Sequence, residues 1–203
     1  RQMCIRDRLM ANSFFSGMLA KMMVPNYNDD TREEVYLAAM LYRIGETAFW
    51  SSGGEVAEQL VQHADMSDKN FSDYFKQEVG SSFNELSKGL TSAWNLSDLL
   101  LKALDEPITR TDEVKIIYFA DQLSTAIASP GDSVEEFTQL LDNIASIMKI
   151  NVRQLKVLIE HTREQAQELL ASYGADKLQK LIKPLPSASD FGKKKLPITA
   201  QAS

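Results

Sequence analysis

Cysteine, histidine and basic residues are scarce in this chain, and each scarcity excludes a class of protein. The 203 residues include one cysteine, Cys4, so no internal disulfide can form, and this suits a cytoplasmic protein. Only His63 and His161 could supply imidazole ligands to a metal. The net charge of −6 argues against a general nucleic-acid surface, which needs clustered lysine and arginine.

Long apolar runs are also missing. Charged residues interrupt every long segment, so we expect no membrane-spanning helix, and no signal peptide is evident. Apolar residues instead recur at helical spacing from residue 13 to residue 182, and nothing alternates apolar and polar residues over the length of a strand. The sequence predicts an all-α bundle of roughly eight or nine helices.

Capping residues and helix breakers mark the predicted helix boundaries. Capping boxes are expected at Thr31 with Glu34, Ser82 with Glu85, and Ser133 with Glu136. Single caps are expected at Ser97 and Asn151, and a helix stop at Gly174. Between Val35 and Glu46 the sequence VYLAAMLYRIGE predicts a central helix that is buried all round, with an inner stripe of Leu37, Leu41, Ile44 and Ala48.

That central stretch resembles the "LLHDIG" core of HDOD domains, a catalytically degenerate branch of the HD phosphohydrolase superfamily. The resemblance extends over residues 13–128 in separate blocks. EVGSSFNELSKGLTSAWNL matches the family block that carries Gly80, Trp94 and Leu96, and Gly45 falls within the central block. VKIIYFADQLS places Asp121 where HD enzymes keep their last metal ligand. The family's usual amino-terminal helices, a later histidine pair and the proline replaced by Ser97 are absent.

The resemblance implies a degenerate site. In an intact HD enzyme a His-Asp pair binds a divalent metal, but this chain has Tyr42 and Arg43 at that point. We therefore expect no metal, no cofactor and no catalytic residue, with Tyr42, Arg43 and Asp121 as the remnant of the site. We further predict that Arg43 pairs with Asp121, because its guanidinium can supply the missing counter-charge. The alternatives are a pair with Glu46 one helical turn away, or an Arg43 side chain that reaches solvent.

The chain is expected to divide into four parts. Residues 1–11 resemble translated sequencing-adapter read-through or a disordered terminus, and residues 12–128 form the HDOD-like core, incomplete at its amino end. Residues 129–183 should pack on this core as further helices, and residues 184–203 should be a disordered tail. If amino-terminal helices are missing, residues 13–24 and the central helix should expose apolar side chains.

The resemblance implies a non-catalytic regulatory or protein-interaction module in bacterial signal transduction, of the kind that accompanies sensory or receiver domains. Its partner would be a protein, a homo-oligomer is compatible with this reading, and a membrane is not expected. One alternative is residual nucleotide binding or phosphohydrolysis in the old HD cleft. Another is DNA binding through the helix pair at residues 144–162, which the acidic composition disfavours.

Overall fold

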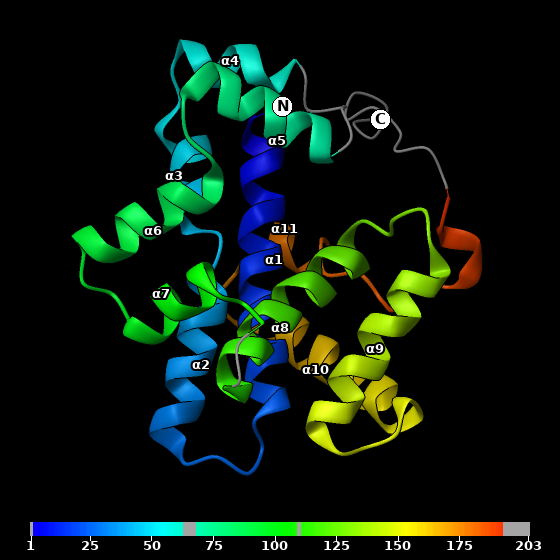
Figure 1. Cartoon of the computed structure of the whole chain (residues 1–203). Coiled ribbons are helices and arrows are strands. Elements are labelled where there is room, and N and C mark those ends of the chain that lie inside the picture. The colour runs from blue at the N-terminus through cyan, green and yellow to red at the C-terminus, as the bar shows by residue number, and fades with distance from the viewer. Residues whose placement is uncertain (1, 63–67, 109–110, 193–203) are drawn as a thin grey trace.

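A computed structural model describes residues 2–62, 68–108 and 111–192 of the chain (Figure 1). Within these ranges the backbone forms eleven α-helices, one short 3₁₀ helix and no strand. The all-α prediction is therefore confirmed, with slightly more helices than expected. The α-helices are α1 (Gln2–Met23), α2 (Asp29–Leu41), α3 (Ile44–Ser52), α4 (Glu55–Val61), α5 (Asp68–Val79), α6 (Phe83–Ala93), α7 (Asp98–Asp105), α8 (Asp112–Ala128), α9 (Val134–Met148), α10 (Val152–Ser172) and α11 (Asp176–Gln179).

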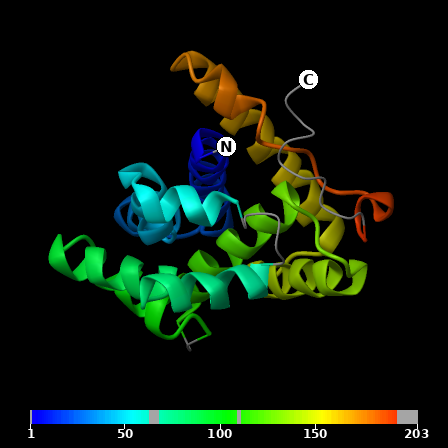
Figure 2. The ribbon, with the colours of Figure 1, turned by 90° about the horizontal axis from the view of Figure 1, so that it is seen from above.

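The helix at the centre of the molecule is α1, not the stretch from Val35 to Glu46. It packs against α2, α3, α8, α10 and α11. Figure 1 shows it in dark blue between these elements, and Figure 2 shows it end-on. Phe15, Leu19 and Met23 on this helix are buried. Because α1 contacts so many helices, its buried apolar side chains connect these helices to one another.

Two apolar clusters lie in the bundle. The larger cluster joins buried side chains of α1, α2, α7, α8, α9 and α10. The smaller one is rich in aromatic rings and joins the start of α1 to α3, α4, α5 and α6. In it the Phe49 ring meets the rings of Trp50 and Phe75 edge to face, with centroids 5.2 and 4.9 Å away. The α3–α6 region thus has a core of its own beside the main one.

The predicted central helix is broken. Helix α2 ends at Leu41 and α3 begins at Ile44, and Arg43 leaves the helical region with φ −101° and ψ 29°. The stretch is also not buried all round, since Leu37 is 47% exposed. The residues that face inward on α2 are Val35, Ala38 and Ala39. Two of these are alanines, whose small side chains allow α2 to lie close to α1.

Most predicted caps are present. The side chains of Ser82, Ser97, Ser133 and Asn151 each accept a hydrogen bond from a backbone N–H in the first turn of the following helix. The full capping box predicted at Ser82 forms, whereas Ser133 is a single cap. Gly174 ends α10 with a φ of 70°. Thr31 does not open α2, because Asn28 lies at the cap position and accepts from the Thr31 N–H at 2.9 Å.

The two ends of the described chain are more ordered than predicted. Residues 2–11 form the first half of α1, and Leu9 and Ala11 are buried there. At the other end, the Leu185 N–H donates to Glu160 at 2.7 Å and the Phe191 ring packs on Phe137. The prediction of disorder is therefore wrong for residues 2–11 and 184–192, and residues 193–203 lie outside the described part. The domain boundaries stay a prediction.

The apolar exposure expected on residues 13–24 is not observed. Phe15, Leu19, Ala20, Met23 and Val24 are buried there, and no large apolar side chain of this segment is exposed. On α2 the expectation holds for Leu37 alone. Helices α8 and α10 pack over this side of α1 and cover it.

Candidate functional site at the junction of α2 and α3

Arg43 and Asp121 form a two-pronged ion pair between the α2–α3 junction and the middle of α8. Arg43 Nε donates to Asp121 Oδ1 at 2.7 Å, and Nη2 donates to Oδ2 at 3.1 Å. The two residues are 78 positions apart in sequence. The predicted pair is confirmed, and its planar fork matches the carboxylate in the way that arginine allows and lysine does not.

The rest of the guanidinium is also hydrogen-bonded. Nη1 of Arg43 donates to Glu46 Oε2 at 3.3 Å, and Nη2 donates to Thr125 Oγ1 at 3.2 Å. The alternative pairing with Glu46 therefore occurs together with the Asp121 pair. Thr125 lies one turn after Asp121 on α8, so Arg43 contacts two successive turns of that helix.

The pair is largely withdrawn from solvent. The Asp121 side chain is 6% exposed and that of Arg43 is 29% exposed. Burial alone would lower the pKa of Arg43, but the charges of Asp121 and Glu46 and their hydrogen bonds raise it above its ordinary value. Arg43 is therefore a permanent cation at this position. Removing it would leave the buried carboxylate with the side-chain amide of Gln122, 3.4 Å away, as its remaining side-chain donor among those described.

Tyr42 lies beside the pair and is half-buried against the main core. Burial raises the pKa of the Tyr42 hydroxyl above its ordinary value, and the negative charge of Asp121 raises it further, while the positive charge of Arg43 lowers it by less. The hydroxyl thus stays protonated at neutral pH and provides no nucleophile.

The start of α3 is fixed by a contact that the sequence analysis missed. The Gly45 N–H, in the first turn of α3, donates to the buried Ser87 hydroxyl of α6 at 3.0 Å. A Cβ on Gly45 would lie 2.4 Å from the Ser87 nitrogen and 2.7 Å from the Phe83 carbonyl oxygen. Gly45 is therefore required because the two backbones approach so closely. The available signal was that Ser87 and Thr91 follow Phe83 at intervals of four, which places small polar residues on the inner face of α6.

The other predicted motif residues end helices. Gly80 follows α5 with a φ of 78°, and its N–H donates to the Lys76 carbonyl. Trp94 and Leu96 flank Asn95, which has a φ of 49° and closes α6. The Leu96 N–H reaches back to the Thr91 carbonyl at 3.1 Å, as in a Schellman motif. Trp94 is 59% exposed, so its place in the motif is at the surface and not in the core.

The residues at the HD position do not fit a divalent metal. Both Asp121 oxygens accept hydrogen bonds from Arg43, and the guanidinium lies where a cation would bind. Within the described residues, no three or more His, Cys, Asp and Glu side chains come together in a way that could hold a metal ion. His161 is exposed on α10, and His63 lies outside the described residues.

The helix pair predicted at residues 144–162 is present as α9 and α10. They are joined by Lys149, which has a φ of 56°, by Ile150, and by the α10 cap Asn151. Arg153, Gln154 and Lys156 are exposed at the start of α10, while Leu155 and Ile159 are buried in the main core. The pair therefore extends the bundle, and its basic residues are few.

No helix in the described ranges combines the length and apolarity needed to cross a membrane.

Comparison with known proteins identifies the family. No curated protein and no solved structure matches the chain. The model of the HDOD domain matches residues 2–107, just over half of the 203 residues, and this range contains Tyr42, Arg43 and Gly45 but not Asp121. The chain therefore belongs to the HDOD family, a branch of HD-like domains.

Proposed function

We propose that this protein is a non-catalytic regulatory module of bacterial signal transduction, located in the cytoplasm, that acts by binding a partner protein through its helical surface. The observation that carries the proposal is the Arg43–Asp121 pair. The Arg43 guanidinium donates to both Asp121 carboxylate oxygens, at 2.7 and 3.1 Å. These oxygens are the atoms that would bind the metal in metal-dependent hydrolysis.

The arrangement of these residues supports a structural role for them and not a catalytic one. Arg43 joins the α2–α3 junction to α8, and Gly45 with Ser87 joins α3 to α6. These contacts fix the relative positions of helices from both apolar clusters. A rigid helical surface of this kind binds partners with little cost in ordering.

Two measurements test the proposal. The first is hydrolysis of bis(p-nitrophenyl) phosphate and of nucleotides in the presence of Mg²⁺, Mn²⁺ or Fe²⁺. We expect no turnover above the protein-free rate. Turnover that requires metal and disappears in Asp121→Asn would contradict the proposal.

The second measurement is partner binding. Photo-cross-linking in the cell, with mass spectrometry of the products, would name candidate partners, and each candidate would then be purified and titrated by calorimetry. We expect saturable binding to at least one protein at low micromolar concentration or tighter. If every purified candidate failed to bind, the proposal would be rejected.

A further inference from the structure

We infer that a groove between α10 and the α1–α2 pair binds an amphipathic helix of a partner protein whose polar face is acidic. This inference rests on the proposed function, because it specifies the class of partner that the module recognises. It depends on the shape of the groove, its apolar surface and its charge.

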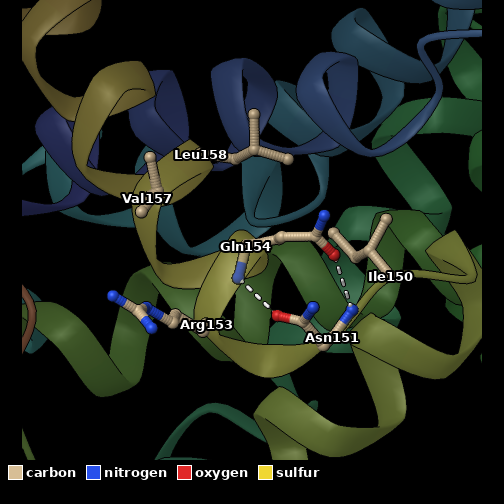
Figure 3. Close-up of a pocket in the computed structure, with 6 residues that line it drawn as sticks. All are labelled: Ile150, Asn151, Arg153, Gln154, Val157 and Leu158. Carbon is tan, nitrogen blue, oxygen red and sulfur yellow. Dashed lines mark hydrogen bonds between the residues drawn. The ribbon is translucent and has the colours of Figure 1, made fainter.

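The groove consists of two adjoining hollows that share Leu158. The first, of about 430 Å³, lies at the start of α10 and is lined by Ile150, Arg153, Val157 and neighbouring residues (Figure 3). The second, of about 600 Å³, lies between α10 and the residues Met18, Met22 and Arg32 of α1 and α2. From Arg153 to Ser172 the lining follows α10 for about 29 Å at 1.5 Å per residue, which matches a helix of about 20 residues.

Apolar side chains are exposed along this groove. On α10, Val157 is 65% exposed, Leu158 37% and Leu169 36%. Across the groove, Met18 and Met22 are half-buried, and methionine side chains adapt readily to different partner surfaces. Exposed apolar groups that line a hollow together mark an interaction site more reliably than scattered ones.

The groove is basic although the chain as a whole is acidic. Arg153, Lys21 and Arg32 line it, and Glu168 is the single carboxylate among the lining residues. The net charge of the chain is −6, whereas three basic side chains and one carboxylate line the groove. Lys21 pairs with Glu33, and the half-buried Arg32 lies 3.6 Å from the exposed Asp29, but pairs at the surface contribute little and can exchange for carboxylates of a partner.

The occupant is best described as a helix. Among the described residues there is no strand, so a partner cannot bind by adding a strand to a sheet edge. A helix laid in the groove would place apolar side chains at helical spacing on Val157, Leu158 and the two methionines. Its glutamate or aspartate residues would then face Arg153 and Lys21.

The test uses two labelled probe peptides of about 20 residues that differ only in charge. Both carry leucine along one helical face, and the polar face is glutamate in one and lysine in the other. Fluorescence anisotropy is measured against the whole protein. We expect the glutamate peptide to bind saturably and at least about tenfold more tightly than the lysine peptide, a difference of about 1.4 kcal/mol.

Single variants locate the binding site. Val157→Asp should weaken the glutamate peptide about tenfold, by placing a charge in the apolar surface, and Arg153→Glu should weaken it while improving the lysine peptide. The matched controls are Val134→Asp, at an exposed valine that opens α9, and Lys102→Glu on α7, neither of which lines the groove. All four changes are at exposed positions, and circular dichroism would verify that each variant is folded.

Several results would overturn the inference. If the two peptides bound equally tightly, the argument from charge would be wrong. If Val134→Asp weakened the glutamate peptide as much as Val157→Asp does, the peptide would not bind in this groove. A dimer in sedimentation that Val157→Asp dissociates would show that a second copy fills the groove. Salt-sensitive DNA binding lost in Arg153→Glu would assign the surface to nucleic acid.

The groove and the proposed function can fail separately. If the purified partner binds Val157→Asp as tightly as it binds the unmodified protein, the groove inference falls and the proposed function stands. If the protein proves to be a metal-dependent hydrolase, the proposed function falls, and with it the helix partner that the groove inference names.

Discussion

Arg43→Ala should destabilise the fold because it leaves the Asp121 carboxylate buried without its cation. Asp121 is 6% exposed, and its remaining side-chain donor in the described residues is Gln122 at 3.4 Å, which is a weak hydrogen bond. Removing one partner of a buried pair costs about 3 to 5 kcal/mol. Arg43 is 29% exposed and water can enter its space, so we expect the lower end, about 3 kcal/mol.

The double variant separates the pair from its surroundings. Asp121→Asn alone should cost about 1 to 2 kcal/mol, because Arg43 keeps Glu46 and Thr125 as partners. Combined with Arg43→Ala it removes the stranded charge, so the double variant should be about 2 kcal/mol more stable than the sum of the single changes predicts.

These free energies would be measured by urea unfolding, with circular dichroism and tryptophan fluorescence as two independent probes of the transition. Coincident transitions by the two probes would justify a two-state treatment. The control is the surface pair of Lys88 and Asp105, which has a nitrogen–oxygen distance of 2.6 Å but side chains 35% and 60% exposed. The same cycle there should give a coupling below about 0.5 kcal/mol. If the Arg43–Asp121 coupling were equally small, the reasoning about burial would be refuted.

Three further predictions concern the same region. Gly45→Ala should cost about 2 to 3 kcal/mol, because its Cβ would lie 2.4 Å from the Ser87 backbone nitrogen, whereas Gly89→Ala, where nothing lies within 4 Å, should be neutral or stabilising in the same urea assay. Ser87→Ala should cost about 1 to 3 kcal/mol by leaving the buried Gly45 N–H without its acceptor, and an unchanged midpoint would contradict this. The pKa of Tyr42 is raised in the folded state, so the unfolded chain loses this proton first as the pH rises. The free energy of unfolding should therefore fall above pH 10, by at most about 1.4 kcal/mol per pH unit, and Tyr42→Phe should make that decline less steep.

Helix positions and caps could be predicted because their signals are local. Ser82, Ser97 and Asn151 each precede an apolar repeat, and the hydrogen bond they make lies within one turn. The same local logic failed at α2. Asn28 and Thr31 are both good capping residues three positions apart, and the choice of Asn28 depends on where the preceding turn places the chain.

The break between α2 and α3 could not be predicted from local sequence. Leu41, Tyr42, Arg43 and Ile44 all tolerate a helix, so propensity gives no warning. The interruption instead coincides with contacts to distant elements: Arg43 reaches α8, and Gly45 touches the α6 backbone. The Arg43–Asp121 pair itself was predictable because it followed from charge balance at two positions that the family resemblance had already brought together.

The permanent charge of Arg43 makes its link to α8 independent of pH. Asp121 and Glu46 raise the pKa of Arg43, so the guanidinium remains charged at any physiological pH. A metal at this position could be gained or lost with its concentration, whereas a guanidinium on the chain cannot. The link between the α2–α3 junction and α8 is therefore constant, and under the proposed function a partner would act at the protein surface and not through this link. Helix α10 packs on α1, which in turn packs on α2, α3 and α8, so the proposed partner along α10 would lie next to a helix that touches all of the elements tied by this link.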